Sequence, residues 1–219
     1  MYNHILSMIK SYKAFVHCFK EARKSIRFRY FNRKDKWGHI GKNSVVHSPS
    51  MVSGKQNIFL GNNVNIDWDN VIYAVNAKFI VKDNSGAAVG LKVITGNHRR
   101  AIGEKKGERG NANLEGKDVI VEEDVWIAAN VTLLAGVHIG RGAIIGAGSV
   151  LRTCKIPPYA IVMGNPGKIV GFRYTPEEIL EHEKSLYNEN NRIPIEKLNK
   201  NYQKYYINKI KEIKKFVTL

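Results

Sequence analysis

Between Val121 and Leu151 the chain carries an aliphatic residue at every sixth position. These positions are Val121, Ile127, Leu133, Ile139, Ile145 and Leu151. A second phase, four residues later, holds small or β-branched residues: Val125, Val131, Val137, Ala143 and Ser149. A period of six fits neither the 3.6-residue period of a helix nor the two-residue alternation of a strand. It predicts a mainly β solenoid in which each short strand directs one aliphatic side chain inward, so that the stacked coils share a continuous core.

The repeat extends toward the N-terminus in a looser form. We expect it to start near Ile40–Gly41 and to be clearer at Leu60–Ile66. Phe79–Lys82 and Ala87–Thr95 are expected to form further coils. Glycines within the regular part, such as Gly136 and Gly142, fit tight corners that need a positive φ or a close backbone approach.

The repeat is interrupted once. Residues 99 to about 117 are polar, charged and rich in glycine, and the pattern resumes at Val119. This segment is predicted to be a loop extruded from the solenoid. A loop of this length inside a compact fold is usually functional or disordered.

Both ends of the chain have helical spacing. Residues 3–31 predict an amphipathic helix with lysines and arginines opposite its apolar stripe, which could pack on the core or lie on a membrane surface. The segment Thr175–Glu178 has the pattern of a capping box with proline in the first turn, and Pro194 separates that helix from a second one. The predicted organisation is therefore a basic N-terminal helix, a β-helix domain with its loop and a C-terminal helical arm (1–37, 38–172 and 173–219).

Charge is concentrated at these helical ends. The 219-residue chain has a formal net charge of +16, and residues 1–37 carry ten Lys/Arg against Glu21 and Asp35. A basic surface attracts nucleic acid, anionic lipid or acidic sugars, but no base-reading motif is present, so no nucleic-acid partner is expected. Two cysteines do not make a disulfide scaffold, and neither a secretory signal nor a membrane-spanning run is evident. A cytoplasmic location is expected, and the basic helices allow contact with the inner face of the membrane.

Several motifs follow one another in the regular part of the chain. They are Val125-Trp126-Ile127-Ala128-Ala129-Asn130, Gly136-Val137-His138-Ile139-Gly140, Ile145-Gly146-Ala147-Gly148-Ser149-Val150, Pro157-Pro158-Tyr159-Ala160 and Gly164-Asn165-Pro166-Gly167-Lys168. In this order they resemble the hexapeptide-repeat acyltransferases, in the branch of galactoside, maltose and xenobiotic O-acetyltransferases. The resemblance is strong over 95–168 and absent from both helical ends. It implies a left-handed parallel β-helix and a homotrimer that binds acetyl-coenzyme A in clefts between neighbouring subunits.

The resemblance also implies roles for single residues. His98 stands in the family's Thr-x-x-His setting before the loop, and imidazole has a pKa suited to taking a proton from an attacking hydroxyl. From the residues alone, a lone histidine at a strand end is more often an ordinary polar residue than a catalytic base. Trp126 is expected to face outward and to wall the acyl or acceptor site. The backbone of Ala129 and of Ala147 is expected to contact the pantetheine arm.

Other candidate residues are expected to bind the coenzyme phosphates or the acceptor. Arg152 and Lys168 are expected to meet the phosphates of the coenzyme, although the segment Arg152–Lys155 is one residue longer than the family's pattern and Gly167 departs from it. Asn65, Asp67 and Asn97 are expected to bind the acceptor. His138 is off the inward phases and is read as a surface or interface residue. No metal is expected.

The activity that the resemblance implies is acetyl-CoA-dependent O-acetylation of a sugar hydroxyl, and three alternatives stand beside it. The acceptor could instead be an antibiotic, which the sequence does not separate from a surface polysaccharide or its precursor. A zinc carbonic anhydrase of the β-helix type needs three histidines brought together, and no histidine pair has ligand-like spacing. A non-catalytic solenoid would have no reason to interrupt its repeat beside His98.

Overall fold

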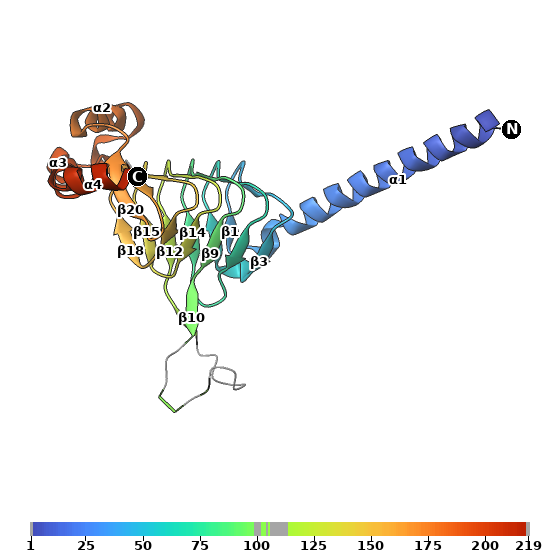
Figure 1. Ribbon diagram of the computed structural model, residues 1–219, viewed down its shortest axis with the longest axis horizontal. Helices are drawn as coiled ribbons and strands as arrows, with labels where there is room; N and C mark the ends of the chain where they lie inside the picture. Colours follow the sequence, from blue (N-terminus) through green and yellow to red (C-terminus); the bar gives the residue numbers. More distant parts are fainter. Residues whose placement is uncertain (1, 99–101, 104, 106–113, 218–219) are drawn as a thin grey trace. The chain divides into compact units, whose positions relative to one another are not determined.

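The computed structural model describes residues 2–98, 102–103, 105 and 114–217, without the side chains of residues 2–9, His98 and Leu114. Most of the predicted loop over 99–117 therefore lies outside the described residues. The chain divides into two compact units, Met1–Lys36 and Trp37–Leu219. Each unit is described by itself (Figure 1).

The first unit is the predicted N-terminal helix. It consists of α1 (Tyr2–Phe31) and a short 3-10 helix, η1 (Lys34–Lys36). The end of α1 is tied to η1, since Lys36 Nζ donates to Tyr30 Oη at 3.0 Å. No helix among the described residues combines the length and the apolar character that a membrane span requires.

The second unit is a parallel β-solenoid of about six turns, with a sheet on each of three faces (Figure 1). The six-stranded sheet contains β1 (His39–Ile40), β4 (Ile58–Leu60), β7 (Phe79–Val81), β12 (Val119–Val121), β15 (Val137–Ile139) and β18 (Cys154–Ile156). The seven-stranded sheet contains β2 (Val45–Val46), β5 (Asn65–Ile66), β8 (Gly86–Ala87), β13 (Trp126–Ile127), β16 (Ile144–Ile145), β19 (Ala160–Met163) and β20 (Lys168–Phe172). The five-stranded sheet contains β3 (Met51–Ser53), β6 (Val71–Tyr73), β9 (Lys92–Ile94), β14 (Thr132–Leu134) and β17 (Val150–Leu151).

The core is built from the two phases of the six-residue repeat. Successive coils stack in register, so that Val121 pairs with Ile139, and Leu133 with Leu151. All eleven positions of the two phases from Val121 to Leu151 are buried, including the polar Ser149. Ser149 is satisfied there, because its Oγ accepts a hydrogen bond from Gly164 N at 3.1 Å. The predicted mainly β solenoid is confirmed, with its N-terminal helix and C-terminal helical arm.

One corner of the solenoid is held by a ladder of asparagines. Asn43, Asn63 and Asn84 occupy equivalent corners of the first three coils, each with a positive φ between 54° and 58°. The amide of Asn43 donates to Asn63 at 3.2 Å, and that of Asn63 donates to Asn84 at 3.0 Å. Asparagine tolerates the left-handed conformation and supplies both a donor and an acceptor, so it suits this corner.

The solenoid is interrupted without losing its register. The chain leaves after β9 as an antiparallel hairpin of β10 (Gly96–His98) and β11 (Leu114–Gly116), which projects from the body (Figure 1). On its return, Val93 of β9 pairs with Leu133 of the next coil. The excursion thus adds chain without displacing the coils.

The solenoid ends where β20 turns back against β19, since this pair is antiparallel. The helical arm follows, with α2 (Pro176–Leu186), α3 (Ile195–Tyr205) and α4 (Ile210–Val217). The remaining 3-10 helices are η2 (Lys55–Asn57), η3 (Glu189–Asn191) and η4 (Ile207–Lys209). The capping box predicted at Thr175 is present, because Thr175 accepts from Glu178 N and Glu178 accepts from Thr175 N.

A buried carboxylate fastens the arm to the last coils. Glu183 of α2 is fully buried. It accepts hydrogen bonds from Arg141 at 3.0 Å, Tyr159 at 2.8 Å and the Ile193 backbone at 3.0 Å. A buried charge is tolerated only when it is paired and hydrogen-bonded in this way.

Candidate functional site

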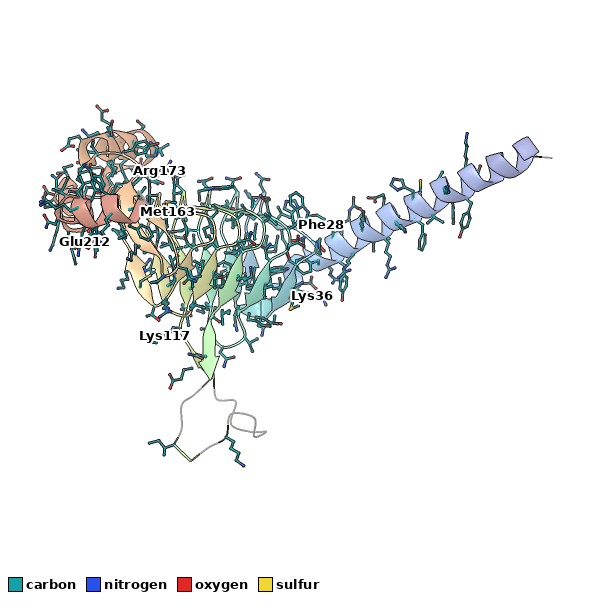
Figure 2. The ribbon with its side chains drawn as sticks, in the orientation of Figure 1. Phe28, Lys36, Lys117, Met163, Arg173 and Glu212 are labelled. Atoms are coloured by element: carbon teal, nitrogen blue, oxygen red, sulfur yellow. The ribbon has the colours of Figure 1, made fainter. Side chains whose placement is uncertain are left out.

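The extruded hairpin is anchored by a buried threonine. Thr95, between β9 and β10, is fully buried, and its Oγ1 lies 3.1 Å from Ala77 O and 3.2 Å from Tyr73 O. Its carbonyl accepts from Lys117 N at 2.9 Å, and Figure 2 shows Lys117 at the root of the hairpin. Both strands of the hairpin therefore leave and re-enter the solenoid at a fixed point.

His98 lies three residues beyond this anchor. It is the last residue of β10, and its backbone pairs with that of Leu114 in β11. Its side chain is not among the parts that the structure describes. Asn97, predicted to bind the acceptor, precedes it on the same strand and is exposed. The root of the hairpin leaves little freedom, since a Cβ on Gly116 would lie 2.5 Å from Asn76 O.

Trp126 and Asn65 share the outer face of the seven-stranded sheet. Asn65, Gly86, Trp126 and Ile144 pair one with the next across four adjacent strands. As predicted, Trp126 faces outward, with 49% of its surface exposed. Its indole lies over Gly86, where an added Cβ would be only 3.1 Å from Cζ3 of the ring. Because Gly86 has no side chain, the Trp126 indole can occupy the space above it, on the side of Asn65.

This face is hollowed beside the indole. A depression of about 300 Å³ is lined by residues from four coils and by Arg173, which follows β20: Asn63, Asn65, Asn84, Ser85, Gly86, Asp124, Val125, Trp126, Ile144 and Arg173. Arg173 closes the end nearest the arm (Figure 2). Its Nη1 donates to Asp124 at 2.8 Å and to Gly142 O at 3.0 Å. An aromatic face beside amide side chains can bind a polar ring compound such as a sugar.

Asn65 is also the centre of a second polar group. His47 Nε2 lies 3.0 Å from its Oδ1, and its Nδ2 donates to Asp67 at 2.9 Å. The His47 ring packs against Trp68, with ring centroids 4.8 Å apart, and Trp68 is 48% exposed. The structure therefore brings the two predicted acceptor residues Asn65 and Asp67 together. Sequence reasoning missed His47 and Trp68.

A signal for His47 existed in the spacing of the early coils. Val46 pairs with Ile66, so the residues that follow them, His47 and Asp67, occupy equivalent positions one coil apart. Recognising Val46 and Ile66 as equivalent inward positions would have placed His47 beside the acceptor candidates.

The two predicted pantetheine contacts lie at one corner of successive coils. Gly148 N donates to Ala129 O at 2.9 Å, which sets the corners one above the other. Within the described part of the chain, the N–H groups of Ala129 and Ala147 donate no hydrogen bond. These two donors therefore remain open to a bound acceptor atom.

The predicted phosphate-binding cations lie toward the end of the solenoid. Arg152 directly follows β17 and is exposed. Lys168, at the start of β20, has its Nζ 5.0 Å from the centre of the Phe216 ring in α4. The same helix and β20 enclose a pocket of about 290 Å³ that Lys168 lines. Lys168 thus has a partner within the chain, which the sequence did not indicate.

The structure does not bring all predicted site residues together within one chain. Trp126 and Asn65 lie on the seven-stranded sheet, whereas the hairpin with Asn97 and His98 leaves from the end of β9 in the five-stranded sheet. No described contact joins the hairpin to Trp126.

His138 belongs to a separate ion-pair group on the six-stranded sheet. Its Nε2 lies 2.8 Å from Glu122, which also pairs with Lys82 at 2.6 Å. Burial by itself would raise the pKa of Glu122, but hydrogen bonds from Lys82 and His138 outweigh it and lower that pKa. Across the described residues, no group of three His, Cys, Asp or Glu side chains could hold a metal ion.

Comparison with known proteins agrees with this geometry. Residues 118–153 match the family "Bacterial transferase hexapeptide (six repeats)". No curated protein matches the chain. A maltose O-acetyltransferase from Clostridium difficile 630 is 30% identical, with a TM-score of 0.55 over 62% of this chain and 69% of that one.

Two further solved structures share the fold. A hexapeptide-repeat-containing acetyltransferase from Vibrio cholerae O1 biovar eltor, complexed with acetyl coenzyme A, is 26% identical, with a TM-score of 0.59 over 67% of this chain and 76% of that one. A galactoside acetyltransferase in complex with coenzyme A is 24% identical, with a TM-score of 0.52 over 70% and 71% of the two chains, a likeness that concerns the fold alone. Together with the repeat and its interruption, these similarities show that the chain belongs to the hexapeptide-repeat acyltransferase family.

Proposed function

We propose that this acyltransferase moves an acetyl group from acetyl-coenzyme A to a sugar hydroxyl of a surface polysaccharide or its precursor. The observation that carries the proposal is the interruption of an otherwise continuous solenoid directly beyond Thr95. The buried anchor there fixes the start of the strand that ends at His98. The acetyltransferases of similar structure support the donor.

In the proposed reaction, His98 acts as general base. Its imidazole takes the proton of the acceptor hydroxyl while the hydroxyl oxygen attacks the thioester carbonyl carbon. Backbone N–H groups at the solenoid corners stabilise the resulting oxyanion. The carbon–sulfur bond then breaks, the proton passes from His98 to the leaving thiolate, and the products are an acetyl ester and coenzyme A. No acyl-enzyme forms.

The binding roles are part of the same proposal. The open N–H groups of Ala129 and Ala147 fit the amide carbonyls of a pantetheine arm. We assign Arg152 and Lys168 to the coenzyme phosphates. The acceptor lies against Asn65 and its partners. We assign Asp67 and Asn97 to the same end of the site and place the enzyme in the cytoplasm.

Because the hairpin and Trp126 lie on different faces of one chain, we propose that the complete site forms between copies. A homotrimer would bring His98 of one copy to Trp126 of its neighbour. Shared sites of this kind are common in closed homo-oligomers.

The test is release of coenzyme A with a panel of sugars and hydroxyl-bearing antibiotics, comparing His98→Ala with wild type. We expect turnover to fall by about 10²–10⁴-fold, because the general base is lost. Calorimetric affinity for coenzyme A should be unchanged. His138→Ala is the matched control and should keep its turnover, since His138 pairs with Glu122 on another face.

Three outcomes would contradict parts of the proposal. Undiminished turnover in His98→Ala would remove His98 as the base. Failure of every hydroxyl acceptor to release coenzyme A would remove O-acetylation itself. Turnover with an antibiotic and no sugar would reassign the acceptor class.

A further inference from the structure

The N-terminal helix carries an exposed apolar stripe that the enzymatic site does not use. Tyr12, Phe15, Phe19, Ile26 and Tyr30 are each between 56% and 69% exposed. With 3.6 residues per turn, these five side chains fall within an arc of roughly 60°. Exposed aromatic residues aligned in this way mark an interaction surface rather than scattered surface residues.

The rest of the helix surface is basic, with Arg23 and Arg29 directly beside the apolar stripe and the other basic residues farther round the helix. Between residues 10 and 31 the helix carries seven basic side chains, all exposed: Lys10, Lys13, Lys20, Arg23, Lys24, Arg27 and Arg29. The only acidic side chain in that range is Glu21, which pairs with Lys24 at 2.7 Å. Long basic side chains beside an apolar stripe can reach headgroups while the stripe enters the acyl region.

We propose that α1 lies on an anionic phospholipid surface, with the apolar stripe buried at the headgroup–acyl boundary. The helix does not cross the bilayer, because no described helix is apolar enough to do so. The stripe runs from Tyr12 to Tyr30, about 27 Å at 1.5 Å per residue, which suits a helix parallel to the surface. This inference is independent of acetyl transfer.

Charge favours a lipid surface over a second copy as the occupant. The stripe spacing would also allow helices of identical copies to pack together. Such packing would bring like-charged rows together, and the pairs that set a coiled-coil register need opposite charges. An anionic bilayer instead attracts each basic residue with about 1 kcal/mol.

Cosedimentation of the full chain with vesicles tests the proposal without any substrate. We expect binding to vesicles of equal parts phosphatidylcholine and phosphatidylglycerol, and little binding to phosphatidylcholine alone. Phe15→Ser and Phe19→Ser should each lower the partition coefficient by about tenfold or more, because each removes a buried aromatic ring. Arg23→Gln and Arg29→Gln should each lower it by roughly fivefold, because these two basic residues lie beside the stripe.

Cys18→Ser is the matched control, because Cys18 is exposed on the same helix but lies off the stripe. It should bind as wild type does. Binding by the doubly substituted Phe15→Ser/Phe19→Ser chain at the wild-type level would overturn the proposal. Failure of the wild-type chain to bind either type of vesicle would also overturn it. If that chain instead self-associates without lipid and the double variant does not, a second copy covers the stripe.

Discussion

At the scale of single residues, the outer face beside Trp126 depends on a neighbour without a side chain. Gly86 does not have a positive φ, so backbone conformation does not require glycine there. Glycine is required because the space above it is occupied. The indole occupies that space and separates Asn65 from Ile144 along the face. Any side chain at position 86 would compete with the ring for the same volume.

We therefore expect Gly86→Ala to lower kcat/KM by about tenfold. The new methyl group would displace the Trp126 ring, and small displacements in a site are costly. Gly171→Ala is the control, because a Cβ there meets nothing within 4 Å. Steady-state kinetics of the two variants checks this. Equal loss in both, or in neither, would show that the position of the indole does not matter.

A second prediction at this scale concerns pH. The pKa of Glu122 is lowered in the folded protein, so its charge stabilises the fold above the unfolded pKa, and this contribution is lost as pH falls through the folded pKa. As the pH falls from 6 to 3, the free energy of unfolding measured in urea should therefore decrease less in Glu122→Gln than in wild type. The difference between the two decreases should be on the order of 1 kcal/mol.

Glu181→Gln provides the comparison for that measurement, because Glu181 is an exposed residue of α2. Its acid profile should follow wild type. If Glu122→Gln and Glu181→Gln behave alike, the pairing of Glu122 with Lys82 and His138 contributes nothing to acid stability.

Sequence reasoning reached Trp126 and Asn65 but not His47 or Trp68. The outward direction of Trp126 followed from the six-residue period, which is strict around it. The early coils are longer, since Val46 pairs with Ile66 twenty positions later and Ile127 pairs with Ile145 eighteen positions later. A fixed period therefore loses its register there, and contacts between coils cannot be read from it.

At the scale of elements, the hairpin of β10 and β11 depends on what lies beneath it. The buried hydroxyl of Thr95 lies within hydrogen-bond distance of Ala77 O and Tyr73 O, and Tyr73 O also accepts from the Thr95 backbone N–H. The sequence predicted an excursion here because the repeat stops. It did not predict the anchor, since a buried threonine has no periodic signature.

Thr95→Val should lower the free energy of unfolding by about 1–3 kcal/mol, because the carbonyl of Ala77 loses the hydroxyl that donates to it. We also expect a loss of turnover, since the same residue fixes the strand that carries His98. Thr132→Val is the control, because Thr132 is half-buried on β14 and its hydroxyl bonds to no described residue. Urea unfolding and initial rates measure both effects. A stable but inactive Thr95→Val would assign the anchor to positioning alone.

At the scale of the whole molecule, the proposed site is divided between the hairpin and the face that carries Trp126. The sequence predicted the family and the solenoid from local repeats. It could not place these two parts relative to each other, because that placement depends on how copies associate. We expect a sedimenting mass three times the 24.8 kDa of the chain.

Mixed subunits test the sharing directly. His98→Ala and Trp126→Ala should each be inactive alone. When equal amounts of the two variants are dissociated and reassembled together, the mixture should recover roughly one quarter of wild-type turnover. One site in four would then receive an intact His98 from one copy and an intact Trp126 from its neighbour. The control is each variant reassembled with itself. No recovery in the mixture would place His98 and Trp126 in sites built within one chain.

The reversal of β20 has a consequence for how long this architecture can grow. Stacked parallel coils expose strand edges that would accept a further coil from another molecule, the route by which such repeats polymerise into fibres. The antiparallel pairing of β20 with β19 breaks that pattern, and Glu183 holds the arm beside it. Loss of the β20 pairing would therefore leave this edge of the seven-stranded sheet open to a further coil.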